Sequence, residues 1–331
     1  MQSTQHEPIA DTTNREMVDP VWTIVGSGAI GLLAAANAVL KGSPKVQLAL
    51  RAQYTKCSSS ASFAFSFCAG QQEYPILLSA VSPSTPIQTL LVPVKAYDVV
   101  NALKTYLPRL TDDAQIVLCH NGMGTIEQVL PLLSAEQGLW FASTTHGAYK
   151  STPRRVVHSG QGKTILGALN PVAQRRFVAE QTSPDHADSV VFAIEQMLGP
   201  CEVVPDIMPF LWQKLVINLV INSLTAIHNV RNGALADIQY QEMIDRLVTE
   251  FLLVAKHSGQ DFVAEQIKEK IAAVVTTTAE NYSSMLQDVK NRRPLEAAYI
   301  SGYLLEQGLQ HQLELPSICT INQALSLITP A

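Results

Sequence analysis

The sequence is poor in charged residues, and the charge that it carries is not basic. Only 15% of its 331 residues are Asp, Glu, Lys or Arg, and the net charge is −5. Proteins that bind nucleic acid usually carry a basic patch or a basic excess, because they neutralise phosphate groups. The composition therefore gives no sign of a nucleic-acid partner.

Cysteine is also scarce, and its placement matches no common framework of disulfides or metal ligands. The five cysteines are odd in number and scattered: Cys57, Cys68, Cys119, Cys201 and Cys319. Dispersed, unpaired cysteines are typical of reduced thiols in the cytoplasm. We therefore expect a cytoplasmic protein without a metal site.

Long apolar segments are missing as well. No unbroken apolar run approaches the roughly 20 residues that a membrane-spanning helix needs. The first twenty residues, "MQSTQHEPIADTTNREMVDP", are polar and lack the apolar core of a signal peptide. We interpret residues 1–20 as a disordered leader and expect no membrane partner. Hydrophobic residues still make up 47% of a chain that is long enough for two domains.

A glycine-rich segment follows the first predicted strand. In "VWTIVGSGAIGLLAAANAVL" a β-branched run leads into the glycines and then into a helical pattern of small residues. Gly26 permits a tight turn, Gly28 lets the backbone approach a pyrophosphate, and Gly31 allows the helix to pack closely on the strand. A glycine-rich turn without a ligand is the alternative. The context favours a dinucleotide site on the helix N-terminus, formed by Gly26, Ser27, Gly28, Ala29, Ile30 and Gly31.

The second predicted strand, "KVQLALR", ends in a base instead of an acid. Sites that prefer NAD usually have an acid near this point, which binds the ribose hydroxyls, whereas the guanidinium of Arg51 suits a 2′-phosphate. An exposed arginine at a strand end is common and is the alternative interpretation. We predict NADPH/NADP+ as the cofactor.

Later segments extend the predicted sheet. The strands "TLLVPVK" and "AQIVLCHNGMG" bring Lys95 and Asn121 to their carboxyl ends, where ligands of open parallel sheets bind. "WFASTTHGAYK", "KTILGAL" and "GPCEVVPD" are predicted as further strands, and the serine-rich region from Cys57 to Pro86 as irregular. His146 and His158 lack ligand spacing and are interpreted as ordinary polar or core histidines.

The pattern changes after Asp206. From Ile207 onward the periodicity is helical and strand signals are few. We predict an α/β protein in which a Rossmann-type dinucleotide-binding domain (21–206) precedes an all-α domain (207–331). The active site is expected in the cleft between the two domains.

The segment "WQKLVINLVINSLTAIHN" contains a polar stripe within an apolar helix. Lys214, Asn218 and Asn222 are four residues apart, and each such step turns about 40° around a helix. Burying these groups without partners would cost about 1–3 kcal/mol each, and more for the charge. The stripe either bonds loops of its own domain or faces a polar ligand. In the second case the lysine can donate a proton to a carbonyl oxygen and stabilise the alkoxide that forms there.

Several motifs in this order resemble the ketopantoate reductase (2-dehydropantoate 2-reductase) family, from Val21 to about Ile328. They are "GSGAIG", "VKAYDV", "HNGMGTIE", "TTHGA", "WQKLVINLVINSLTAI", "RNGAL", "ENYSSMLQDV" and "LEAAYISGYLL". The resemblance implies reduction of ketopantoate by NADPH on the route to pantothenate. It also implies a small-molecule 2-oxo acid as the binding partner. For the assembly of the protein we consider a homodimer.

The resemblance also assigns roles to individual residues. Lys214 matches the proton donor of the family. The substrate residues that it implies are Lys214, Asn218, Asn222, Asn232, Asn281, Tyr282, Ser283 and Ser284. The cofactor residues that it implies are Gly26 to Gly31, Arg51, Lys95, Asn121, Ala148 and Glu296.

Some late positions have simpler interpretations, and some depart from the family pattern. Pro294 looks like the first residue of a helix, which would place Glu296 in a first turn, and "NYSS" reads equally as a turn or a helix cap. Ala298, Ser301 and Ser223 stand where the family usually has an acid, an asparagine and a proline. Two alternatives therefore stay open: a reductase of a different 2-oxo acid, and a non-enzymatic NADP-binding sensor.

Overall fold

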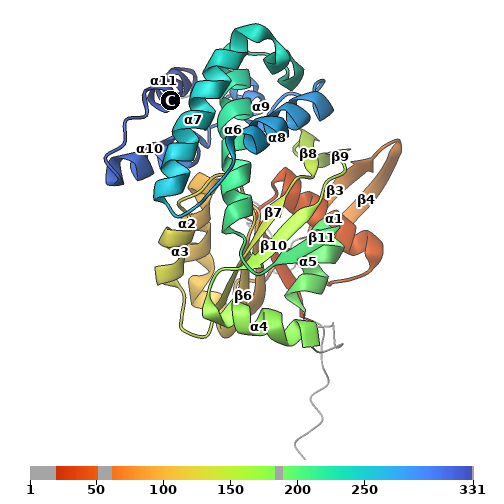
Figure 1. Ribbon diagram of the computed structural model, residues 1–331. Coiled ribbons are helices and arrows are strands. Elements are labelled where there is room, and N and C mark those ends of the chain that lie inside the picture. The colour runs from red at the N-terminus through yellow and green to blue at the C-terminus, as the bar shows by residue number, and fades with distance from the viewer. Residues whose placement is uncertain (1–19, 51–61, 183–188, 330–331) are drawn as a thin grey trace, which may run out of the picture.

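A seven-stranded sheet organises the first part of the chain (Figure 1). The computed structural model describes residues 20–50, 62–182 and 189–329, so residues 1–19, Arg51 and Cys57 lie outside the described residues. The strand order is β11-β10-β7-β6-β5-β1-β2, and every pair is parallel except β10 with β7. The strands are β1 (Trp22–Val25), β2 (Val46–Ala49), β5 (Ile87–Val92), β6 (Leu110–Leu118), β7 (Gly138–Thr144), β10 (Thr164–Ala168) and β11 (Cys201–Val204).

The sheet is covered by helices on both faces, as a parallel sheet requires. Successive strand residues point to opposite faces, so Leu90 and Val92 belong to one apolar cluster and Leu91 to the other. The flanking helices are α1 (Ala29–Lys41), α2 (Ala96–Tyr106), α3 (Ile126–Val129), α4 (Pro171–Thr182) and α5 (Val190–Leu198), with the 3₁₀ helices η2 (Leu107–Arg109) and η3 (Leu130–Leu132). Buried residues of α1 and α5 share a cluster with Leu91, and those of α2 share one with Leu90.

The chain changes direction around β1. β2 pairs with one edge of β1 and β5 with the other, so the crossovers leave β1 in opposite directions. Such a switch point opens a crevice at the carboxyl end of the strand, where ligands of open α/β sheets bind. The glycine-rich segment lies at this end, and the predicted α/β fold with a Rossmann-type sheet is confirmed.

A second, four-stranded sheet covers α1 and was not predicted from the sequence. Its order is β4-β3-β9-β8, built from β3 (Ser62–Ala69), β4 (Gln72–Ser79), β8 (Gly147–Thr152) and β9 (Arg155–Gly160). The prediction of an irregular region from Cys57 to Pro86 is therefore wrong over residues 62–79. The segment "WFASTTHGAYK" is also not one strand, because it leaves the first sheet after Thr144 and enters the second at Gly147.

The remainder of the described chain, residues 207–329, contains helices and no strand (Figure 1). This confirms the predicted helical C-terminal region. Its helices are α6 (Met208–His228), α7 (Ile238–His257), α8 (Ala264–Thr277), α9 (Ser284–Lys290), α10 (Ser301–Gln310) and α11 (Pro316–Ile328), with the 3₁₀ helices η4 (Asn232–Ala236) and η5 (Ala297–Tyr299).

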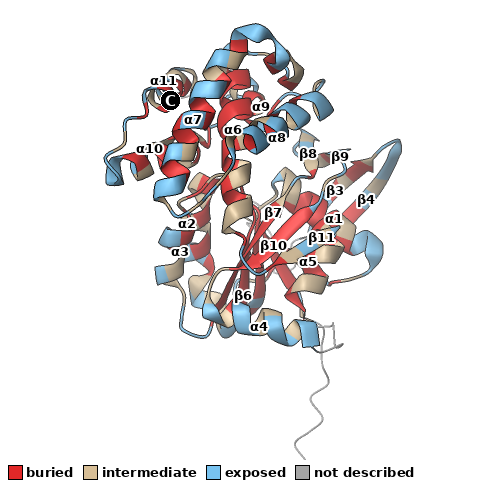
Figure 2. Cartoon of the chain, in the orientation of Figure 1, coloured by how far each residue is buried: buried red, intermediate tan, exposed pale blue. Residues whose placement is uncertain are grey.

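Helix α6 is the central element of the helical region, and α7, α8, α9 and α11 pack around it. Figure 2 shows α6 coloured as buried or intermediate over almost its whole length. By length and composition alone this helix is apolar enough to cross a membrane, but 67% of its most apolar stretch is buried inside the protein. Its apolar character is therefore that of a core helix.

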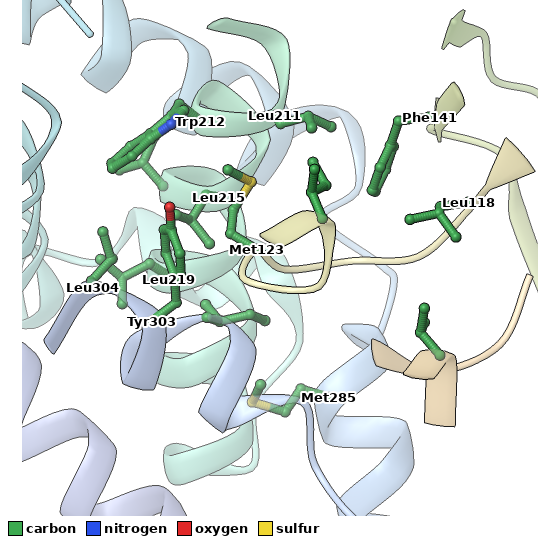
Figure 3. Packing of buried hydrophobic residues seen from close by; sticks show 14 of the residues in the cluster. Leu118, Met123, Phe141, Leu211, Trp212, Leu215, Leu219, Met285, Tyr303 and Leu304 are labelled. Atoms are coloured by element: carbon green, nitrogen blue, oxygen red, sulfur yellow. The ribbon is translucent and has the colours of Figure 1, made fainter. Parts of the chain in front are cut away.

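The two regions share one apolar cluster on one side of the sheet. Figure 3 shows Leu118 and Phe141 of the sheet near Met123 and Leu215, which carry the cluster towards the helices. Trp212 then packs against other rings of the helical region, with centroid distances of 5.9 Å to Phe251 and 6.0 Å to Tyr303. Because the core is continuous here, the polar stripe of α6 is held at a fixed place against the sheet.

Candidate functional site

The glycine-rich loop connects β1 to α1 at the switch point. Gly26 has a φ of +78°, a conformation that other residues rarely adopt, and its N–H bonds Ala49 O at 2.8 Å. A Cβ at Gly31 would lie 2.9 Å from a side-chain carbon of Pro93, so only glycine permits this approach of α1 to the sheet. Gly28, the N-cap, contributes no side-chain hydrogen bond to the first turn of α1. The N–H groups of that turn therefore suit an anionic ligand such as a pyrophosphate.

Lys214 projects from α6 towards the carboxyl end of the sheet. Its ammonium donates a hydrogen bond of 2.7 Å to the backbone oxygen of Thr144, the last residue of β7. Burial lowers the pKa of Lys214, and the negative charge of Glu296 partly opposes this effect. A lysine with a lowered pKa is a better proton donor than an exposed one.

Two of the amides predicted to bind the substrate contain polar atoms without partners. Two of these atoms are buried and have no partner among the described residues: Asn218 Nδ2 donates no hydrogen bond, and Asn232 Oδ1 accepts none. The other amide atom of Asn232, Nδ2, donates to Thr278 Oγ1 at 2.8 Å, which fixes the side chain. Asn222, one turn beyond Asn218, is buried as well. Unsatisfied buried groups are uncommon in folded proteins, so these two atoms are candidates for contact with a polar ligand.

The segment from Asn281 to Ser284 lies beside η4, because the backbone oxygen of Asn281 accepts a bond of 3.0 Å from Asn232 N–H. Ser283 is buried and caps α9, its Oγ accepting from Leu286 N–H at 3.1 Å. The cap interpretation of this segment therefore holds for Ser283, whereas Asn281, Tyr282 and Ser284 are exposed.

An ion-pair cluster joins the sheet to the helical region. Lys95, the N-cap of α2, places its ammonium 2.7 Å from Asp288 Oδ2 and 2.9 Å from Glu296 Oε2. Glu296 Oε1 also accepts from Ala96 N–H at 3.1 Å. Burial opposes the charged form of Lys95, but Glu296 and Asp288 raise its pKa above the ordinary value. Asp288 was not among the predicted site residues, although its position in "ENYSSMLQDV" indicated that the motif contained a further acid.

The expectation that Pro294 begins a helix is wrong. Residues 293–295 are not helical, and Glu296 precedes η5 as its N-cap. The reason is tertiary, since the Glu296 carboxylate is held by Lys95 and by the backbone of Ala96. Its position is therefore set by the sheet region and not by a helix dipole.

Asn121 lies in a loop beyond β6 that is held in two ways. His120 Nδ1 donates to the backbone oxygen of Asn121 at 2.9 Å, so its Nε2 accepts from Thr125 Oγ1, also at 2.9 Å. Gly122 has a φ of +84°, and a Cβ there would lie 2.6 Å from the backbone oxygen of Tyr299. Burial lowers the pKa of His120, which favours the neutral ring. Sequence patterns had not indicated His120 as part of the site.

Ala148 lies in β8, opposite His158 of β9. His146 and His158 form a pair, with His146 Nδ1 and His158 Nε2 3.1 Å apart, and His146 Nε2 donates to Gly199 O. Within residues 20–50, 62–182 and 189–329, no group of three or more His, Cys, Asp or Glu side chains is placed to hold a metal ion. The histidine pair joins β9 to the loop after β7.

Two of the three departures from the family pattern are buried serines. Ser301 is fully buried, and its hydroxyl donates to Asn322 Oδ1 of α11 at 2.8 Å. Ser223 is fully buried too, and its hydroxyl has no partner among the described residues. Neither side chain joins Lys214, Asn218 or Asn232, so neither departure removes a polar group from the site.

Comparison with known proteins identifies relatives over both regions. Residues 22–171 match the family model described as Ketopantoate reductase PanE/ApbA, and residues 206–329 match its C-terminal counterpart. A 2-dehydropantoate 2-reductase of Vibrio cholerae serotype O1 is 36% identical over 71% of this chain and 74% of its own. One from Escherichia coli O157:H7 is 32% identical over 89% of this chain and 90% of its own.

A solved structure shares the fold. D-mandelate dehydrogenase with NADH and anilino(oxo)acetate superposes with a TM-score of 0.80 at 19% identity, covering 93% of this chain and 97% of its own. The glycine loop, the switch point and the uncapped start of α1 fit a nicotinamide dinucleotide. Taken with the relatives, these observations show that the chain belongs to the ketopantoate reductase family of oxidoreductases.

Proposed function

We propose that this protein reduces 2-dehydropantoate to pantoate with NADPH, a reaction of pantothenate biosynthesis. The observation that carries the proposal is the partly buried Lys214, which lies on the same helix as the unpartnered amide of Asn218. A 2-oxo acid brings a carbonyl oxygen and further polar groups, and these match a proton donor that shares its helix with amides. The two reductases named above are named for this activity, and each aligns with most of this chain.

Lys214 acts as the general acid in this proposal. An ammonium has three N–H donors, of which one is used by Thr144 O, so two remain for the substrate carbonyl. Its charge stabilises the alkoxide that develops on this oxygen, and its proton then completes the hydroxyl group. The reduced nicotinamide, when bound, supplies the hydride that the carbonyl carbon receives.

The amides orient the substrate. Asn218 Nδ2 is a free donor and Asn232 Oδ1 a free acceptor, and a hydroxy-substituted oxo acid can satisfy both. Orientation of this kind contributes several kcal/mol of barrier lowering without any proton transfer by the amides themselves. The exposed Ser284, at the start of α9, is assigned to the substrate carboxylate, which the N-terminal N–H groups of a helix also favour.

The proposed preference for NADPH rests on Arg51, which lies outside the described residues, and on Lys95. In the structure the Lys95 ammonium is shared by two carboxylates, so its role with the 2′-phosphate stays a prediction. Arg51 is therefore the residue on which the preference mainly depends.

The test is a substrate and cofactor panel. Oxidation of NADPH is followed with 2-dehydropantoate, pyruvate and 2-oxoisovalerate, and each substrate is repeated with NADH. We expect turnover with 2-dehydropantoate and NADPH to exceed every other pair. Activity restricted to another 2-oxo acid would support the reductase chemistry but show that 2-dehydropantoate is not the substrate. Tight NADPH binding without any turnover would favour a non-enzymatic sensor.

A further inference from the structure

Lys150 is a cation that the described residues leave without a negative partner. It lies in β8, the edge strand of the second sheet, and pairs there with Val156 of β9. Residues that pair across two strands share a face, and Val156 is fully buried in the cluster that contains the core of α1. The stem of Lys150 therefore runs along the face that covers α1.

The head of Lys150 reaches the glycine-rich loop. Its ammonium donates a hydrogen bond of 3.2 Å to the backbone oxygen of Ser27. Ser27 immediately precedes Gly28, the N-cap of α1, which is a helix of 13 residues whose first turn has no side-chain cap. A positive side chain thus lies beside N–H groups that already favour an anion.

Among the described residues, no negative side chain compensates the charge of Lys150. Burial lowers the pKa of Lys150, and the positive charge of Arg293 lowers it further. Arg293 belongs to the helical region, where its Nη1 is 3.6 Å from Asp288 Oδ1. None of the ion pairs found among the described residues includes Lys150. Lys150 therefore brings an uncompensated positive charge to the glycine-rich loop, and an anionic ligand there would compensate it.

We propose that Lys150 binds the pyrophosphate of the dinucleotide cofactor. The inference rests on the proposed function for the presence of a dinucleotide. It adds a side-chain contact to a loop whose other contacts are backbone N–H groups. It also separates the binding of the diphosphate from that of the 2′-phosphate, which is assigned to Arg51 and Lys95.

The experiment measures dissociation constants for NADPH and NADH by nicotinamide fluorescence. The proteins are the unmodified chain, Lys150→Gln and Lys150→Arg. Lys163→Gln is the matched control, because Lys163 is an exposed lysine paired with Glu202 on the surface. One lost hydrogen bond to a charged group weakens binding by about tenfold to a hundredfold. We expect this loss in Lys150→Gln for both dinucleotides by the same factor, and near-normal binding in Lys150→Arg and Lys163→Gln.

A third ligand, adenosine 2′-monophosphate, locates the effect. It has the 2′-phosphate but neither phosphate of the pyrophosphate, so Lys150→Gln should bind it as the unmodified chain does. A loss for NADPH without a loss for NADH would move Lys150 to the 2′-phosphate and overturn the proposal. Unchanged binding of both dinucleotides would also overturn it. So would a loss for all three ligands with a lower melting temperature, which would show that Lys150 only supports the loop.

Failure of the proposed function gives a different result. An unmodified chain that binds both dinucleotides but reduces no 2-oxo acid would reject the reductase activity and leave the Lys150 comparison intact. An unmodified chain that binds neither dinucleotide would reject both proposals.

Discussion

The ammonium of Lys95 lies 2.7 Å from the carboxylate of Asp288, and this contact joins the N-terminus of α2 to α9. The two residues are far apart in sequence and belong to the sheet region and the helical region. Glu296 makes the same lysine the centre of a three-membered cluster. Both carboxylates are 5% exposed, so they depend on Lys95 for charge compensation.

Replacement of Lys95 by Met should destabilise the protein by about 3 kcal/mol at neutral pH, because two buried carboxylates would lose their cation. Burial already raises the pKa of Asp288, and without Lys95 that pKa rises further. A raised folded-state pKa costs stability above the unfolded value of about 4 and costs nothing below it. The deficit measured by urea unfolding should therefore shrink as the pH falls towards that value.

The same Lys95→Met protein tests the cofactor-binding role that the family resemblance gives to Lys95. If Lys95 also binds the 2′-phosphate, the affinity for NADPH should fall more than that for NADH. If the substitution changes the affinities for NADPH and NADH by the same factor, Lys95 does not bind the 2′-phosphate, and its ion pairs between the two regions are its remaining role.

Replacement of Lys214 by Ala should lower kcat by about 10²- to 10⁴-fold, the range for loss of a general acid. NADPH binding should stay near normal, and Lys270→Ala, an exposed lysine on α8, serves as the control. A folded Lys214→Ala protein that had lost NADPH binding would contradict the assigned role.

The pH profile gives an independent check of Lys214. A general acid is active in its protonated form, so the rate is retained below its pKa and lost as the pH rises through it. Burial lowers this pKa, and the rate should therefore fall at a pH below the ordinary lysine value of about 10.4. Measured kcat against pH checks this, and an alkaline limb unchanged in position in Lys214→Arg would exclude Lys214 as its source.

Replacement of Asn218 by Ala should impair catalysis without reducing stability. The Nδ2 group has no partner among the described residues, so its removal costs no protein hydrogen bond. We expect a higher KM for the oxo acid and a free energy of unfolding that is unchanged or slightly raised. Ser223→Ala is the control on the same helix: it removes an unpartnered buried hydroxyl and should raise stability by about 1 kcal/mol with unchanged KM.

Substitutions of Ser283 and Ser284 should also have different effects, the first on stability and the second on substrate binding. Ser283 caps α9 and also accepts from Thr225 Oγ1 at 2.7 Å, so Ser283→Ala should cost about 1–2 kcal/mol of stability. Ser284→Ala should leave the unfolding midpoint unchanged and raise the KM for the oxo acid. Thermal melts and steady-state kinetics on the two proteins would distinguish the roles, and identical behaviour would contradict them.

The missed β3–β4 hairpin shows that a local signal was present in the sequence. Phe63, Phe65 and Phe67 alternate with small residues and are buried, which is the period of a half-buried strand. The serines nearby led to the prediction of an irregular region. What the pattern could not show are the partners: the buried face packs in one cluster with α1, and β3 pairs with β9, which lies far along the chain.

The sequence by itself determined the glycine turn, the strand–helix pattern of the first region and the polar stripe on α6, since each depends on residues close together in the chain. Only the tertiary structure decided which charges meet. Lys95 with Asp288 and Glu296, Lys214 with Thr144 O, and Lys150 with Ser27 O all join distant segments. Local periodicity reports which face of an element is buried, whereas the partner that compensates a buried charge depends on how the elements pack.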